Sequence, residues 1–212
     1  MMRRLPILPT LVVAAAIAAM IALGFWQIRR AHWKDALLAS YAQGAKAAEL
    51  YGLPTDMPAE QLAFRRAHVL CQIATGPTEL GGADRSGRTG FRNIVGCTLI
   101  DGRTIMADLG WSAIGAKPAL PAIGQRIEAS GQLIPDDVLA NRVIGNRPRA
   151  MPLLLVLETG APGLSPSVPP SIDMIPNNHR SYAVQWFLFA AVALTIYLLA
   201  LRKRNRASRD GQ

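Results

Sequence analysis

The sequence is poor in cysteine and histidine, with two cysteines and three histidines among 212 residues. Cys71 and Cys97 belong to no CxxC motif and have no histidine at ligand spacing, which argues against a zinc or redox site. Without paired cysteines or a methionine cluster, the chain also lacks the ligands that soft metals such as copper prefer. In an oxidising compartment the two cysteines could form a disulfide, provided that their strands are neighbours; buried free thiols are the alternative.

Motifs for catalysis and phosphate binding are also missing. The glycine-rich run at 81–90 lacks the lysine and the helix start of a phosphate loop, and we interpret it as a flexible hairpin connection. Asp136 and Asp137 are adjacent, so in an extended chain they point apart and make a poor acid/base pair. We expect them to be turn residues. No serine has a histidine at a recognisable spacing, and the histidines are scattered. The sequence therefore shows no catalytic constellation.

The net charge of +9 does not indicate a nucleic-acid-binding protein, because of where the excess lies. The chain has two long apolar runs, and seven of its 23 basic residues lie before the first run or after the second, where Asp210 is the one acidic residue. The region between the runs holds the other 16 basic residues and 13 acidic ones. Positive charge beside an apolar span marks the cytoplasmic side of a membrane. We therefore expect no nucleic-acid partner and a membrane protein with both ends in the cytoplasm.

The two uncharged runs, 5–28 and 181–201, are each long enough to cross about 30 Å of hydrocarbon as a helix. This predicts a cytoplasmic N-terminus at 1–4, a basic cytoplasmic tail at 202–212 and a domain at 29–180 on the other side of the membrane. Membrane lipid is a predicted partner. A cleaved signal peptide is the alternative for the first run. However, that run continues into a tryptophan-rich exit, which is typical of a helix that stays in the membrane.

Between the spans, the patterns are mainly those of β-strands. Helical spacing persists at first, which predicts a helical stalk over 29–48, and a short helix is predicted at 58–62. Strands are predicted around residues 69–73, 92–100, 103–111, 127–133 and 152–157. Asp101-Gly102 predicts a hairpin with a type I′ turn. Five prolines and almost no charge at 160–176 indicate an extended tether that returns to the membrane.

The predicted fold class is therefore a two-helix transmembrane hairpin with an inserted, mainly antiparallel β (α+β) domain. Several short strands at such spacing suggest a small antiparallel sheet or a partly closed barrel.

Polar and aromatic side chains gather where the second span begins. On a helical wheel, six of them fall within about 120° of arc: Asn178, His179, Tyr182, Gln185, Trp186 and Phe189. Hydrogen-bonding side chains near hydrocarbon are costly unless they face protein, water or a ligand. Two interpretations stay open: an interfacial belt in which His179 bonds to its partner helix, and a neutral imidazole with aromatic neighbours that acts as an axial haem ligand.

Two motifs resemble those of the surfeit locus protein 1 family, the assembly factors of cytochrome c oxidase. Residues 23–34, LGFWQIRRAHWK, resemble the family's LGxWQxxRxxWK signature, and residues 177–187, NNHRSYAVQWF, resemble its NNHxxYAxxWF signature. An apolar span and a basic end follow the second motif, as in the family. The middle of the chain is less similar, since residues 107–111 keep only the Gly-Trp of a strand that commonly ends NRGW.

The resemblance implies a non-enzymatic role in maturing the catalytic subunit of the oxidase, at the haem a stage, in a bacterial inner membrane with the central domain in the periplasm. Haem a is the implied cofactor, and the catalytic subunit and haem a synthase are the implied partners. His179 would ligate the haem iron, with Trp186 near the ring. Position and charge, rather than the resemblance, suggest His32 as a second ligand, Tyr182 in the same layer, and Arg29, Arg30 or Arg180 as partners of the propionates.

Other functions stay open at this point. The protein could be a cofactor-free membrane scaffold that stabilises oxidase assembly intermediates. A two-span receptor is a further alternative, but the short segment after Leu201 leaves no room for a cytoplasmic output domain.

Overall fold

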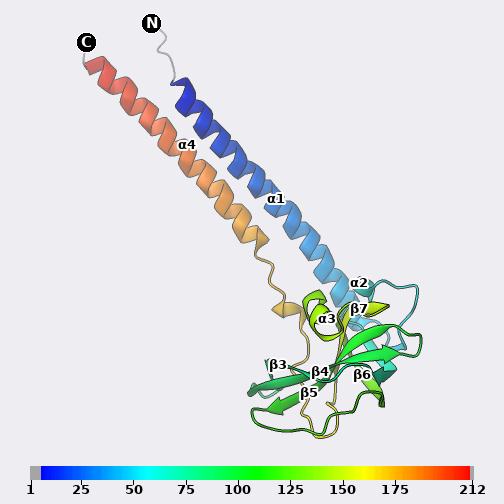
Figure 1. The fold of residues 1–212 in the computed structure, drawn as a ribbon. Helices are drawn as coiled ribbons and strands as arrows, with labels where there is room; N and C mark the ends of the chain where they lie inside the picture. Colours follow the sequence, from blue (N-terminus) through cyan, green and yellow to red (C-terminus); the bar gives the residue numbers. More distant parts are fainter. Residues whose placement is uncertain (1–5, 211–212) are drawn as a thin grey trace. The chain divides into compact units, whose positions relative to one another are not determined.

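A computed structural model describes residues 6–210, and the side chains of residues 6–206. The chain divides into two compact units, Met1–Leu37 with Pro176–Gln212 and Leu38–Ile175, which we name the helix pair and the barrel unit. The predicted segment 1–4 and the last two residues of the predicted tail lie outside the described residues. The elements, many of them labelled in Figure 1, are α1 (Ile7–Lys46), β1 (Leu50–Tyr51), α2 (Ala59–Leu62), β2 (Arg66–Ile73), β3 (Thr78–Ala83), β4 (Thr89–Leu99), β5 (Thr104–Ala113), β6 (Arg126–Pro135), α3 (Asp137–Val143), β7 (Ala150–Leu157), η1 (Ile172–Met174) and α4 (His179–Asp210).

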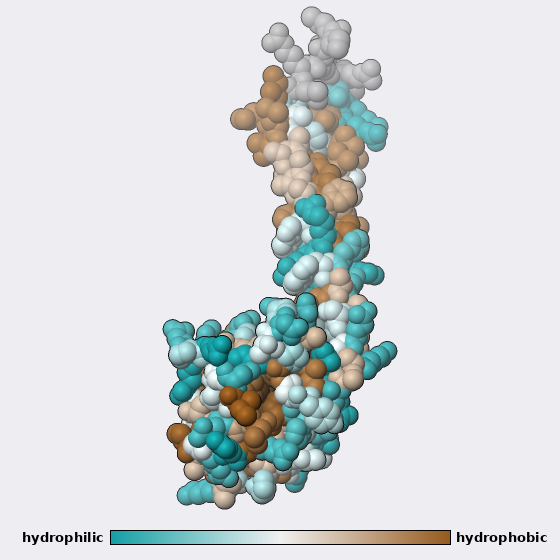
Figure 2. All heavy atoms as spheres, turned by 90° about the vertical axis from the view of Figure 1, so that its right-hand side faces the viewer, coloured by the Kyte–Doolittle hydropathy of each residue, from teal (hydrophilic) through white to brown (hydrophobic). Residues whose placement is uncertain are grey.

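Two long apolar helices form the helix pair. Within residues 6–210, the segments long and apolar enough to cross a membrane are Ile7–Lys46, which is α1, and Ile172–Arg206, which contains most of α4. Apolar side chains are exposed along both helices, and Figure 2 shows them on the outer surface. Such a surface suits contact with lipid tails.

Small residues let α1 and α4 approach closely. Buried small residues recur seven apart on each helix: Gly24 and Ala31, Ala183 and Ala190. A Cβ on Gly24 would lie 2.7 Å from the ring of Phe187, so a larger residue there would have to displace this ring. Further along the pair, the Thr10 and Tyr197 hydroxyl groups share a hydrogen bond. Contacts at both places set the helices antiparallel and fix which residues face each other.

Five strands close into a ring in the barrel unit. β2, β6, β7, β5 and β4 follow one another around it, and residues 71–73 of β2 pair with 97–99 of β4 to complete it. β1 and β3 each add a strand outside the ring, β1 on β2 and β3 on β4. The mainly antiparallel pairing that the sequence predicted is confirmed, although β1–β2 and β5–β7 are parallel. The ring closes because β2 and β4 each hold two partners along one edge.

Alternating side chains from the five strands fill the ring. Members of this core include Val69, Val95, Ile105, Leu109, Leu133 and Leu155. A second cluster lies on the other face of β4, β5 and β7, where Leu139 and Val143 of α3 cover Ile94, Met106 and Leu154. Because it is covered on both faces, β5 is buried at every residue except Ala113.

The turn predicted at Asp136 and Asp137 is wrong, because a helix begins there. Asp136 is the N-cap of α3, and its carboxylate accepts a hydrogen bond from the Leu139 N–H at 2.8 Å. Leu139, Ala140 and Val143 then follow at helical spacing and pack against the sheet. An acid after a strand is typical of a turn, but it is equally typical of a helix cap.

The hairpin at Asp101-Gly102 exists, but its predicted type I′ turn is wrong. Gly102 has a φ of 82°, whereas Asp101 is not in the left-handed region that a type I′ turn requires of both residues. The Gly102 N–H donates to Leu99 O at 3.0 Å, and the Leu99 N–H donates to Arg103 O at 2.8 Å. This is a longer loop with glycine at its left-handed position, and the Asp101 carboxylate stabilises it by accepting from Arg103 Nε at 2.7 Å.

A disulfide joins Cys71 and Cys97, whose Cα atoms are 5.6 Å apart. The bond links β2 to β4, the two strands whose pairing completes the ring. The bond closes a loop with a sequence separation of 26 residues, and by restricting the unfolded chain it raises the free energy of unfolding by about 3 kcal/mol.

The segment predicted as a tether, 160–176, is hydrogen-bonded to the barrel in its first half. The Ala161 N–H donates to Leu109 O at 2.6 Å, and Trp111 and Ser165 exchange backbone hydrogen bonds of 2.7 and 3.0 Å. Ser167 Oγ donates to the buried Asp108 carboxylate at 3.1 Å. This half of the segment is therefore part of the barrel unit's structure.

Half of the glycine-rich run at 81–90 is strand, so the predicted hairpin connection is confirmed only for its middle, which joins the antiparallel strands β3 and β4. Residues 81–83 belong to β3 and 89–90 to β4, so only 84–88 form the turn. The buried Asp84 organises this turn. Its carboxylate accepts from the Ser86 N–H at 3.0 Å, from Ser86 Oγ at 2.7 Å, and from the Arg88 N–H and Nε at 2.9 and 2.8 Å.

Asp84 is expected to make this turn sensitive to acid. Burial alone would raise the pKa of the carboxyl, but the hydrogen bonds from Ser86 and Arg88 and the charge of Arg88 outweigh it and lower the pKa from 3.8 to about 2. Since the folded pKa is the lower one, the carboxylate stabilises the fold fully above about pH 4, and this contribution is lost as the pH falls through about 2. We expect Asp84→Asn to lose less stability than wild type over that range, measured by urea unfolding. Parallel pH profiles would contradict the assignment.

Candidate functional site on the helix pair

His179 is the first residue of α4 and is half-buried. The first turn of the helix is closed by the Tyr182 N–H, which donates to Asn178 O at 3.1 Å. His179 Nδ1 lies 2.8 Å from Oε1 of Gln27 on α1. An amide oxygen can only accept a hydrogen bond, so Nδ1 carries the proton. In the neutral ring, Nε2 is therefore the nitrogen with a free lone pair, which is the nitrogen that a metal ion would take.

Asp35 of α1 holds the start of α4 through both carboxylate oxygens. Asn177 Nδ2 donates to Oδ1 at 2.7 Å, and Arg180 Nη2 donates to Oδ2 at 2.8 Å. The two partners flank His179 in the sequence on either side. Gln27 and Asp35 thus fix the histidine in place: Gln27 sets the ring, and Asp35 sets the backbone that carries it.

Trp186 and Tyr182 lie on α4 beyond His179. Trp186 follows His179 by seven residues, which places it about 20° from His179 around the helix and about 10 Å further along the helix axis. Its ring packs edge-on against Phe189, with centroids 6.1 Å apart. Tyr182 is exposed. The aromatic groups that the sequence assigned to this layer therefore lie on α4 itself, on or near the face that carries His179.

The remaining predicted site residues lie on other sides of the helices or already have partners. His32 is exposed, and about 140° of helix rotation separates it from Gln27, the α1 residue that contacts His179. The Arg30 guanidinium stacks 3.9 Å from the centre of the Trp33 ring. Arg180 binds Asp35, and Arg29 is exposed. The ligand role of His32 and the propionate roles of the arginines stay predictions.

Sequence reasoning missed Asp35, although one signal pointed to it. Asp35 is the first acidic residue in the chain, and it lies in a helix immediately after a cluster of basic residues. An acidic residue so close to the end of a predicted span needs a cationic or hydrogen-bonding partner. Its partners, Asn177 and Arg180, lie in the other signature motif, some 140 residues away.

A second histidine cluster lies on the outer face of the barrel unit and was also invisible in the sequence. His68 Nε2 is 2.8 Å from Glu128 Oε1, and His68 Nδ1 is 2.7 Å from Ser130 Oγ. An ionised Glu128 accepts a hydrogen bond from Nε2–H, so in neutral His68 the Nδ1 atom accepts one from the Ser130 hydroxyl. Because the Glu128 side chain is 71% exposed, water screens the pair, and we interpret the cluster as a cross-strand contact of β2 with β6.

The helix pair carries both signature motifs, and comparison with known families agrees. The model described as SURF1 family matches residues 14–191, which covers both motifs and the whole barrel unit. The chain belongs to the SURF1 family. This confirms the resemblance to the surfeit locus protein 1 family. The SURF1 family is associated with assembly of cytochrome c oxidase, which implies an oxidase partner for this SURF1-family protein. A comparison with curated proteins finds no match.

Proposed function

We propose that this SURF1-family protein holds haem a for cytochrome c oxidase during maturation of the catalytic subunit, and that His179 Nε2 would bind the haem iron. The observation that carries the proposal is the 2.8 Å contact between His179 Nδ1 and Gln27 Oε1. In the neutral imidazole it puts the lone pair on Nε2, and it gives the ring the kind of hydrogen-bonded support that metal-ligating histidines have in proteins. We also propose that the protein lies in a bacterial inner membrane. The basic residues before the first span and after the second support both termini in the cytoplasm, which would put the barrel unit in the periplasm.

The residues around His179 suit a haem. A bound haem would supply an iron that takes an axial nitrogen, a large apolar ring and anionic propionates. His179 would hold the iron, and Trp186 would pack near the ring from the same face of α4. Arg30, about 60° from Gln27 around α1, is an exposed cation that a propionate could approach, whereas Arg29 is about 160° away. The chain's own residues orient the ligand: Gln27 Oε1 accepts the hydrogen bond from His179 Nδ1–H, and Asp35 fixes the start of α4.

The test is the absorption spectrum of protein purified from cells that make haem a. We expect His179→Ala to lose the bound haem, and Gln27→Leu, which removes the acceptor for Nδ1–H, to weaken haem binding by about 10- to 100-fold. His68→Ala, in the barrel unit, is the matched control and should leave the spectrum unchanged. His32→Ala reports separately on a second ligand.

Two outcomes would overturn the proposal. An unchanged spectrum and haem stoichiometry in His179→Ala would remove His179 as ligand. If wild type carries no haem while an oxidase subunit still co-purifies with it, the protein is a cofactor-free scaffold, and the Asp35 contacts then serve only to hold the two helices together.

A further inference from the structure

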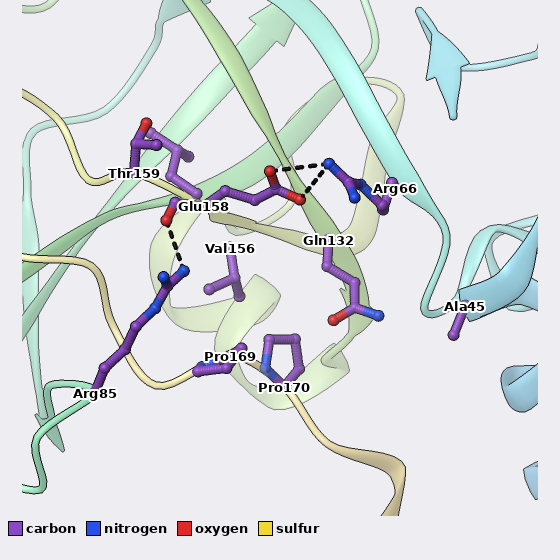
Figure 3. Close-up of a pocket in the computed structure, with 10 residues that line it drawn as sticks. Ala45, Arg66, Arg85, Gln132, Val156, Glu158, Thr159, Pro169 and Pro170 are labelled. Carbon is purple, nitrogen blue, oxygen red and sulfur yellow. Dashed lines mark hydrogen bonds and ion pairs between the residues drawn. The ribbon is translucent and has the colours of Figure 1, made fainter. Parts of the chain in front are cut away.

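A cleft of about 430 Å³ lies on the outer surface of the barrel unit. Four parts of the chain build it: the end of α1 at Ala45, the outer face of β2, β6 and β7, the β3–β4 turn at Arg85, and the prolines 169 and 170. Figure 3 shows Val156, Gln132 and the two prolines around its centre, with the arginines at its sides. The volume is within the range of pockets that bind small molecules.

Two arginines flank Glu158 in this cleft. Arg66 Nη2 lies 2.9 and 3.0 Å from the two oxygens of the Glu158 carboxylate, and Arg85 Nη2 donates to the Glu158 backbone carbonyl at 2.6 Å. A guanidinium has five N–H donors. Within the part of the chain whose side chains are described, the Nε and Nη1 donors of both arginines have no partner. Two cations against one carboxylate leave a net charge of +1 and unused donors directed to this region.

Apart from Gln132 and Thr159, the rest of the lining is apolar. Ala45 and the two prolines present accessible hydrocarbon, whereas Val156 and Leu157 are almost wholly buried beside them. The proline rings have little conformational entropy to lose when a ligand packs on them. Gln132 Nε2 donates to Phe64 O at 3.0 Å, so its own oxygen is an acceptor at the edge of the cleft. The cleft thus combines a cationic side with an apolar wall.

We propose that this cleft binds a small amphipathic anion. Its carboxylate or phosphate group binds Arg66 and Arg85, whose planar forks match such groups, and its apolar body packs on the prolines. The site is separate from the haem proposal, since none of its residues belongs to the helix pair. A bound ligand would touch both the end of α1 and the segment that leads to α4, the two connections of the barrel unit to the spans.

The probes are 1-naphthoate, 1-naphthyl phosphate and the uncharged 1-naphthalenemethanol, titrated by calorimetry into the full-length protein. For a ligand of this size, a typical binding energy per atom corresponds to a Kd of about 1 mM. We expect both anions to bind at this level and the alcohol at least about tenfold more weakly. Preference for the carboxylate or for the phosphate identifies the head group.

Substitutions separate a built site from general surface charge. The double variant Arg66→Met with Arg85→Met should lose at least about tenfold in affinity for the anions, whereas Arg142→Met, an exposed arginine of α3, should lose none. Glu158→Gln removes the competing carboxylate and should tighten binding about three- to tenfold. Equal binding of the alcohol, or unchanged anion binding in the double variant, overturns the proposal, and neither result bears on haem at His179.

Discussion

Replacing Arg92 by methionine is expected to lower the free energy of unfolding of the barrel unit by about 3–5 kcal/mol. Arg92 on β4 binds Asp108 on β5 with Nε and Nη2 each 2.7 Å from the same carboxylate oxygen. The Asp108 side chain is 0% exposed. Methionine keeps much of the volume of the arginine but leaves a carboxylate inside the protein without its cation, and a buried unpaired charge is among the most destabilising changes known.

The measurement is urea unfolding of the full-length protein in detergent, followed by hydrogen exchange of the β4 and β5 amides. Arg66→Met is the matched control, because Arg66 and Glu158 also form an ion pair of 2.9 Å, but with side chains 52% and 40% exposed. Solvent screens that pair, so its loss should cost at most about 1 kcal/mol. Equal losses in the two variants would show that burial of Asp108 does not decide the energy.

Most strands of the barrel unit could be predicted from the sequence, but their pairing could not. Alternation of apolar side chains marked β2, β5 and β6, because one face of each strand fills the ring. The closure of the ring depends instead on long-range pairing, such as Cys97 with Ile73 and the parallel pairing of β5 with β7, and periodicity carries no information on which strands meet.

The sequence did not predict the short elements α3 and β3, because their local signals were weak or misleading. α3 has seven residues, too few for its periodicity to stand out beside the turn-like Asp136. β3 contains two adjacent glycines, which are rare in strands and common in loops. In both cases contact with the sheet decides the structure, and propensity alone gives the opposite answer.

The candidate site divides in the same way. His179 and Trp186 were identified from the sequence because polar and aromatic residues at the end of an apolar run are conspicuous. Their supports were not, because Gln27 is separated from His179 by 152 residues. A helical wheel shows which face of one helix is polar, but the pairing of Gln27 with His179 also needs the register of α1 against α4, which contacts such as that of Gly24 with Phe187 set.

Gly131→Ala is expected to destabilise the barrel unit by about 3 kcal/mol or more, although it adds a single methyl group. Gly131 lies in β6 opposite Leu157 of β7. An added Cβ would lie 2.1 Å from the Val156 carbonyl oxygen and 2.7 Å from its carbon. These are backbone atoms held by the β6–β7 ladder, so they cannot rotate away as a side chain could. The substitution must therefore separate two strands of the closed ring, with loss of hydrogen bonds and of core contacts around Leu133 and Leu155.

Gly81→Ala provides a control of opposite sign. Gly81 is also a strand glycine outside the left-handed region, but a Cβ there meets no atom within 4 Å. Alanine restricts the unfolded chain without a clash in the folded one, so this variant should gain about 0.4–1 kcal/mol. Urea unfolding of both variants measures the difference. If Gly131→Ala is as stable as wild type, then the β6–β7 contact can widen without cost, and the ring is looser than its register implies.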